Sequence, residues 1–211
     1  MLVRNRFVTL EGVATCARSV LGWDVRPAVL LVLAISISGC GGRPFNVKPR
    51  PDKTNHEYRA SGHVEGVAIR AQALTDEDYL YETFDANLIL AGIYPVRLEL
   101  KNTGSESLEF KRARFELRSA AGRRFSAVNA RKAYKNLISY YGVSIYSKTG
   151  NQRALEDFSS HSLNIDGKFE AGESRQGLLF FDAPADAFNG GSVTLSAARL
   201  PGGESIELKL D

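Results

Sequence analysis

The chain has 211 residues with 27 Lys or Arg and 24 Asp or Glu, so its formal net charge at pH 7 is +3. A charge this close to balance does not indicate long-range attraction to nucleic acid. The 154 residues from Tyr58 to Asp211 are enough for one domain that buries about two-thirds of the surface of its unfolded chain.

An apolar run over residues 28–37 follows Arg26 and ends in Ile37-Ser38-Gly39-Cys40. A basic flank, about 7–15 apolar residues and a small-residue cleavage site are typical of a secretory signal. The run is too short for a transmembrane helix, which needs about 20 apolar residues. The alternative, a buried core helix, fits less well because a polar stretch rich in Gly and Pro follows directly.

The tetrapeptide Ile37-Ser38-Gly39-Cys40 resembles the bacterial lipobox, in which an aliphatic residue, a small residue and Gly or Ala precede Cys. This resemblance implies that residues 1–39 are a lipoprotein signal peptide and that the thiol of Cys40 is diacylated. The chain would then be anchored by lipid in the cell envelope. By resemblance to the sorting rule of Gram-negative bacteria, Gly41 in place of Asp favours the periplasmic face of the outer membrane.

Cleavage before Cys40 would also remove Cys16, so no thiol would remain for a disulfide, a metal site or a nucleophile. It would leave 23 basic and 22 acidic residues. Residues 41–57 are rich in Gly, Pro and charge, which predicts that residues 40–57 form the acylated Cys and a semi-extended tether. We expect this tether to space the domain from the membrane.

Residues 58–211 alternate between apolar and polar side chains in a pattern typical of β-strands. The clearest strands are expected at residues 63–74 and 94–102, and the continuous apolar run at 177–182 indicates a central strand packed on both faces. A change of phase at Lys111-Arg112 predicts a bulge or a change of sheet. About seven such strands favour a mainly β fold, an antiparallel β-sandwich. We expect its core to include Leu98, Leu100, Phe115, Leu179 and Phe181.

Two stretches are predicted to be helical. Thr75-Asp76-Glu77-Asp78 is similar to a capping box and indicates a short helix toward Phe84. Asn129 can cap a longer helix that Gly142 ends. Residues 129–162 would then be a partly helical insertion, and a connection of this length is usually functional or disordered.

The strand of residues 92–102 with its Gly/Ser turn, and the Gly-Glu-Ser strand of residues 171–181, resemble paired strands of immunoglobulin-like domains in small bacterial lipoproteins of unassigned function. The resemblance covers about half of residues 40–211. It implies an immunoglobulin-like β-sandwich that binds or scaffolds, and no chemistry.

The residues that could support chemistry are scattered. His56, His63 and His161 have no ligand-like spacing, and adjacent acids such as Glu156 and Asp157 suit helix starts better than acid–base catalysis. Residues 162–173 have part of the spacing of a calcium loop, but Ser162 stands where the first carboxylate is needed. A turn at Asp166-Gly167 is the simpler interpretation. We therefore predict no catalytic residues, no metal and no cofactor.

Residues 118–155 contain no acidic side chain but eight basic ones and four tyrosines. Such a segment can contact an anionic surface, although a solvated helix face with its tyrosines packed on the sheet explains it too. The basic surface is expected between Arg123 and Arg153, with Arg131, Lys132 and Lys135 as the contact residues.

These observations favour a membrane-anchored envelope lipoprotein that acts as a non-catalytic binding or scaffolding module. Its partners would be the membrane, through lipid on Cys40, and an anionic envelope polymer, lipid headgroups or another envelope protein. Two other interpretations remain open: an envelope enzyme whose site is not visible in sequence, and a structural subunit of an envelope complex.

Overall fold

The structure is a computed structural model that describes residues 43–50, 57–188 and 191–210. The chain divides into two units, Met1–Cys40 and Gly41–Asp211, and all described residues belong to the second. The predicted signal peptide and Cys40 therefore lie outside the described residues. Among those residues, no helix combines the length and apolarity needed to cross a membrane.

The regular elements follow one another in this order: β1 (Ala60–Val64), β2 (Val67–Ala73), α2 (Glu77–Phe84), β3 (Ile93–Asn102), β4 (Leu108–Glu109), β5 (Arg114–Arg118), β6 (Arg124–Val128), α3 (Ala130–Tyr140), α4 (Lys148–Ser160), β7 (Lys168–Phe169), β8 (Ser174–Asp182), the 3₁₀ turn η1 (Ala185–Phe188), β9 (Thr194–Ala198), the 3₁₀ turn η2 (Pro201–Gly203) and β10 (Ile206–Lys209).

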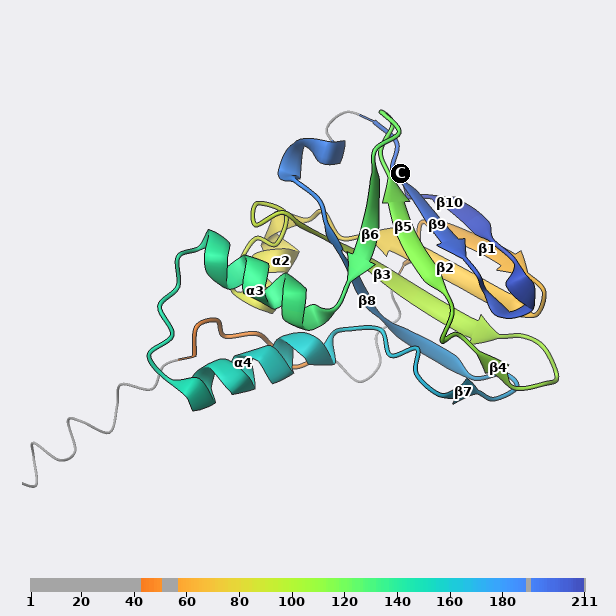
Figure 1. Cartoon of the computed structure of the whole chain (residues 1–211), viewed down its shortest axis with the longest axis horizontal. Helices are drawn as coiled ribbons and strands as arrows, with labels where there is room; N and C mark the ends of the chain where they lie inside the picture. Colours follow the sequence, from red (N-terminus) through yellow and green to blue (C-terminus); the bar gives the residue numbers. More distant parts are fainter. Residues whose placement is uncertain (1–42, 51–56, 189–190, 211) are drawn as a thin grey trace, which may run out of the picture. The chain divides into compact units, whose positions relative to one another are not determined.

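Eight strands form one antiparallel sheet in the order β1-β2-β3-β8-β6-β5-β9-β10, while β4 pairs with β7 separately. The two end strands come together, since a Cβ atom on Gly62 of β1 would collide with Ile206 and Leu208 of β10. The sheet is thus curled into a nearly closed barrel (Figure 1). The mainly β, antiparallel class is confirmed, and the immunoglobulin-like arrangement stays a prediction. The change of phase at Lys111-Arg112 is a change of sheet, between β4 and β5.

The barrel interior is filled by alternate side chains of its strands. Leu98, Leu100, Phe115 and Phe181 are buried there as predicted, but Leu179 is only partly buried. The strand expected at residues 63–74 is wrong in its bounds. It is a hairpin, because Glu65 and Gly66 adopt positive φ angles of 30° and 78° and reverse the chain between β1 and β2.

Strand β8 is central and packs on both faces, as its continuous apolar run predicts. Phe181 points into the barrel, whereas Leu178 and Phe180 point to a second core. This helical-layer core lies between the outer face of β3 and β8 and the helices α2, α3 and α4 (Figure 1). The largest side chains that the helices contribute to it are Leu80, Phe84, Tyr134, Leu137 and Phe158.

The helices begin close to where the sequence predicts. Asn129 caps α3, accepting the Lys132 N–H at 2.8 Å, and Asp76 rather than Thr75 caps α2. Helices α3 and α4 both lie between β6 and β8, so the predicted insertion at 129–162 is helical in two parts. Arg97 alternates with apolar residues along β3, yet it is buried because α2 covers it: its guanidinium donates to Gln72 and to the Tyr79 hydroxyl.

Residues 43–50, which we call the strap, correct the expectation of a spacing tether. Phe45 and Val47 are only 5% and 2% exposed and belong to the helical-layer core. The Lys48 N–H donates to the Thr83 carbonyl at 2.8 Å, and Arg50 donates to the Gln176 carbonyl. The sequence suggested an extended tether because prolines and charges surround the two apolar residues that dock. Residues 51–56 lie outside the described residues.

Candidate functional site

The candidate contact residues lie on α3, whose other face is held in the helical-layer core. Ala133, Tyr134 and Leu137 are buried, and the Tyr134 hydroxyl donates to Asn151 of α4 at 3.0 Å. These contacts fix the rotation of α3. As a result Arg131, Lys132 and Lys135 all face solvent, which agrees with the face predicted from helical spacing.

The three cations differ in their partners. Lys132 forms an ion pair with Asp182 at 2.7 Å, with both side chains about half exposed. Within the described ranges, neither Arg131 nor Lys135 forms an ion pair. Two of the three charges are therefore available to an external anion, and the third is shared with a carboxylate.

The basic segment does not form one continuous surface. Arg124 begins β6 and α3 begins after the end of that strand, so Arg123 and Arg124 lie a strand's length from Arg131. Arg118 pairs with Glu207 at 2.6 Å, and the Arg123 guanidinium lies over the ring of Phe125. The surface predicted between Arg123 and Arg153 is thus divided between the β5–β6 hairpin and the helices.

A cluster of exposed apolar side chains occupies the end of α3 and the loop to α4. Tyr140, Tyr141, Ile145 and Tyr146, which we call the aromatic tip, are 54%, 36%, 50% and 87% exposed. The described part of the chain exposes two other large apolar side chains, Tyr81 and Leu90. Four of the six exposed large apolar side chains in the described part of the chain therefore fall within the seven residues 140–146. In Figure 1 the α3–α4 loop lies at the end of the helical layer far from β1 and β10.

Tyr141 joins the tip to two other segments of the chain. Its hydroxyl accepts the Asn87 N–H at 3.0 Å and donates to the Asn87 carbonyl at 3.3 Å. Its ring lies 5.0 Å from that of Tyr140 and 5.9 Å from that of Phe45 in the strap. Partial burial raises the pKa of Tyr141; the hydrogen bond with the Asn87 backbone opposes this shift, and one with Tyr81 adds to it.

Sequence reasoning did not identify the aromatic tip. The alternative interpretation packs the four tyrosines on the sheet, and of these only Tyr134 is buried, in the helical-layer core. The sequence feature that could have indicated the aromatic tip is Gly142, whose φ of 60° ends the helix. Side chains beyond that residue no longer follow the helical period that assigns a buried face.

His161 holds the strap at its other end. The residue is 4% exposed, and its Nε2–H donates to the Lys48 carbonyl at 2.8 Å. Its ring lies 5.0 Å from that of Phe84. Burial lowers the pKa of His161, and the nearby Arg50 and Arg97 lower it further, while the Lys48 carbonyl and Asp157 oppose the shift.

The residues of the calcium-like pattern are engaged with one another. The Asn164 side chain accepts the Asp166 N–H at 2.9 Å, and Gly167 has a φ of 75°, which together make the turn of the simpler interpretation. Glu173 accepts from Arg175 and from the Glu170 N–H. Across the described residues, His, Cys, Asp and Glu form no group of three that could hold a metal ion.

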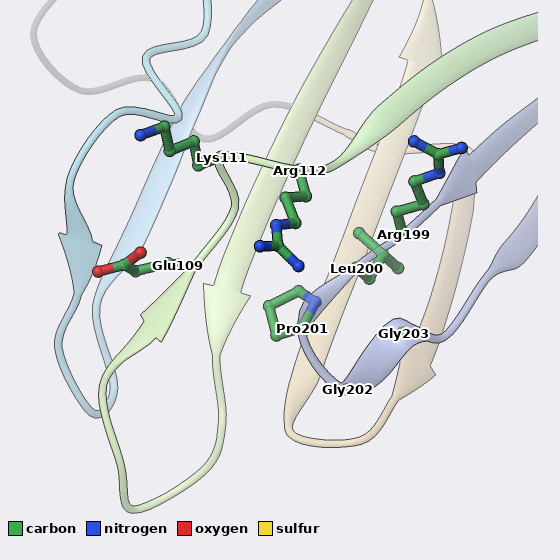
Figure 2. Close-up of a pocket in the computed structure, with 8 residues that line it drawn as sticks. All are labelled: Glu109, Lys111, Arg112, Arg199, Leu200, Pro201, Gly202 and Gly203. Atoms are coloured by element: carbon green, nitrogen blue, oxygen red, sulfur yellow. The ribbon is translucent and has the colours of Figure 1, made fainter.

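A surface cleft of about 990 Å³ opens on the barrel, lined by Glu109, Lys111, Arg112, Arg199 and residues 200–203. Figure 2 shows that its charged side chains do not converge: Arg112 extends toward Pro201, while Lys111 and Arg199 extend away from it. The cleft offers three cations at the surface and no cluster of groups aimed at one point.

No family model matches the chain, and neither does any curated protein sequence. Solved structures of uncharacterized bacterial proteins are similar to it in part. A conserved hypothetical protein from Bacillus anthracis aligns at 11% identity and a TM-score of 0.39, covering 75% of this chain and 100% of that chain. An uncharacterized beta-sandwich protein from Clostridium difficile 630 aligns at 13% identity and a TM-score of 0.35, covering 78% and 100%.

A functionally unknown protein from Listeria monocytogenes EGD-e aligns at 10% identity and a TM-score of 0.38, covering 78% of this chain and 88% of that chain. At TM-scores below 0.5 these similarities assign no function to the chain.

Proposed function

We propose that the chain is a lipid-anchored protein of the bacterial cell envelope and acts as a non-catalytic binding module for anionic envelope material. Its anchor is the diacylated Cys40, and its contact residues are Arg131, Lys132 and Lys135. The barrel serves as the scaffold. In this proposal, its central strands β3 and β8 correspond to the two stretches that resemble immunoglobulin-like domains.

The observation that carries the binding proposal is the fixed outward face of α3. Its cations project from a helix whose opposite face is buried, within 38 residues that contain no carboxylate. Each cation near a negatively charged bilayer contributes about 1 kcal/mol, and this attraction fades as salt shortens the Debye length. Binding should therefore be strongest at low ionic strength.

The test is cosedimentation of the unit Gly41–Asp211, which contains both cores, with anionic vesicles and with purified cell wall as separate arms. We expect Arg131→Gln/Lys132→Gln/Lys135→Gln to weaken binding in the arm where the wild type binds. The matched control is Lys111→Gln/Arg112→Gln/Arg199→Gln, which removes the same charge from the cleft of Figure 2 and should bind as the wild type does.

Equal loss in both triple variants would mean that net charge, and not the α3 face, decides binding. Failure of the wild type to bind either material at low salt would contradict the proposal and leave the basic segment as a solvated face. The arm that retains the protein identifies the source of the anion, lipid headgroup or wall polymer.

A further inference from the structure

The strap limits how far the domain can stand from its proposed anchor. Arg43, two residues beyond Gly41, already forms an ion pair with Asp157 of α4 at 2.6 Å, and Phe45 is 5% exposed. An extended chain spans at most about 3.6 Å per residue, so the five residues from Cys40 to Phe45 can bridge no more than about 18 Å. The membrane that holds an acylated Cys40 must therefore be close to the helical layer.

Besides α2 and α4, the strap also touches the aromatic tip. Phe45 packs edge to face on Tyr141, whose ring contacts Tyr140. Beyond them Ile145 and Tyr146 are 50% and 87% exposed. The strap, which begins three residues after Cys40, is thus in direct contact with Tyr141 of the aromatic tip.

The chemistry of the tip suits the boundary between lipid and water. Tyrosine is enriched there because its ring is apolar and its hydroxyl is polar. Lys148 follows Tyr146 by two residues. Residues 118–155 contain no carboxylate that anionic headgroups would repel. The tip exposes four large apolar side chains within seven residues of the chain, and exposed apolar groups of this kind are typical of interaction sites.

We propose that the aromatic tip lies in the headgroup region of the bilayer that holds Cys40, so that the strap fixes the domain against the membrane instead of spacing it away. This inference rests on the proposed acylation of Cys40. It adds a second, apolar contact to the anchor, and it gives the α3 cations a fixed distance from the lipid surface.

The test uses tryptophan as a depth probe, because the one tryptophan of the chain, Trp23, lies in the predicted signal peptide. Tyr146→Trp places an indole at the tip and Tyr140→Trp provides a second reporter there. Ser205→Trp is the matched control, since Ser205 is exposed between η2 and β10, on the barrel. Tyr146 is 87% exposed, so its replacement leaves both cores unchanged.

Each variant is measured in vesicles with and without brominated acyl chains, in two arms. One arm uses protein extracted from membranes, and the mass of its Cys40-containing peptide is determined. The other uses residues 40–211 joined through the Cys40 thiol to a maleimide lipid. We expect bromine to quench the Tyr146→Trp and Tyr140→Trp indoles in both arms, with a blue-shifted emission, and to leave Ser205→Trp unquenched.

The failures are distinguishable. An unmodified Cys40 in the membrane-extracted protein overturns the proposed function and this inference with it. A lipid on Cys40 with no quenching at the tip in either arm overturns the inference alone. An indole that is shielded from acrylamide in the native membrane but not quenched by bromine also overturns it, because the tip would then be covered by a protein.

Discussion

The ring of Phe45 meets the ring of Tyr141 edge to face, with 5.9 Å between their centroids. Phe45 also lies 6.3 Å from Tyr134, so a residue five positions after Cys40 packs on the helix that carries Arg131, Lys132 and Lys135. This contact connects the proposed anchor to the proposed binding face.

Phe45→Ala should release the strap. Truncating a buried Phe costs about 3–5 kcal/mol where the surroundings cannot collapse, and the strap has few other apolar contacts to hold it. We expect amide hydrogen exchange to accelerate over residues 43–50 while the barrel strands stay protected. The control is Lys48→Gln, a substitution in the strap that breaks an exposed ion pair with Glu82 of α2. It should leave exchange over residues 43–50 unchanged. Unchanged exchange in Phe45→Ala would show that the strap is held by other contacts.

Leu98→Ala should destabilise the whole domain, because Leu98 is fully buried in the barrel core. The loss of its transfer free energy and the cavity left behind cost about 2–5 kcal/mol. Leu90→Ala, at a position 46% exposed, should melt near the wild-type temperature. Thermal unfolding followed by circular dichroism checks both, and equal melting temperatures for Leu98→Ala and the wild type would mean that the inward face of β3 is misassigned.

Gly177→Ala should disturb the contact between β8 and the segment after α4. A Cβ atom at position 177 would collide with the backbone of Ser162 and Leu163. The segment would have to move, weakening the bonds from the Leu178 N–H to the His161 carbonyl and from the Leu163 N–H to the Leu178 carbonyl. Overpacking of this kind costs about 1–3 kcal/mol.

Chemical denaturation measures the effect of this substitution. Gly104→Ala is the control, since its new Cβ would meet nothing closer than 3.4 Å. Equal stability of the two variants would contradict the close approach.

His161 should make stability depend on pH. Burial lowers its pKa in the folded protein below the ordinary value of 6.5, so the unfolded chain takes up the proton first. The stability that His161 contributes is complete above pH 6.5 and is lost as the pH falls from there toward the folded pKa. His161→Gln keeps a side-chain N–H for the Lys48 carbonyl without titrating. The drop in melting temperature between pH 7.5 and pH 5.5 should be smaller in this variant; an equal drop would assign the acid sensitivity to other groups.

Sequence patterns predicted the parts of the fold that local periodicity determines. Alternation placed Leu98 and Leu100 in the core, and the side-chain cap at Asn129 located α3 within one residue. Leu178 and Phe180 pack outward while Phe181 packs inward, which the unbroken apolar run of β8 implied.

The errors arose where distant segments decide the outcome. Arg97 alternates with apolar residues and should be exposed, but α2 covers it and Tyr79 accepts its hydrogen bond. Phe45 and Val47 are isolated in a polar segment, and their burial depends on packing with side chains of α2, α3 and α4. The spacing of Arg131 and Lys135 predicted the exposed face of α3. It did not predict that the aromatic tip follows at the C-terminal end of the same helix.

The mass of the N-terminal peptide, measured on protein extracted from bacterial membranes with detergent, tests the central claim most directly. We predict a chain that begins at Cys40 and carries a diacylglyceryl group on its thiol, and a Cys40→Ser variant that stays unprocessed and without acyl label. A chain that retains residues 1–39, or one that begins at Cys40 with a free thiol, would contradict the lipid anchor and the membrane-bound function derived from it.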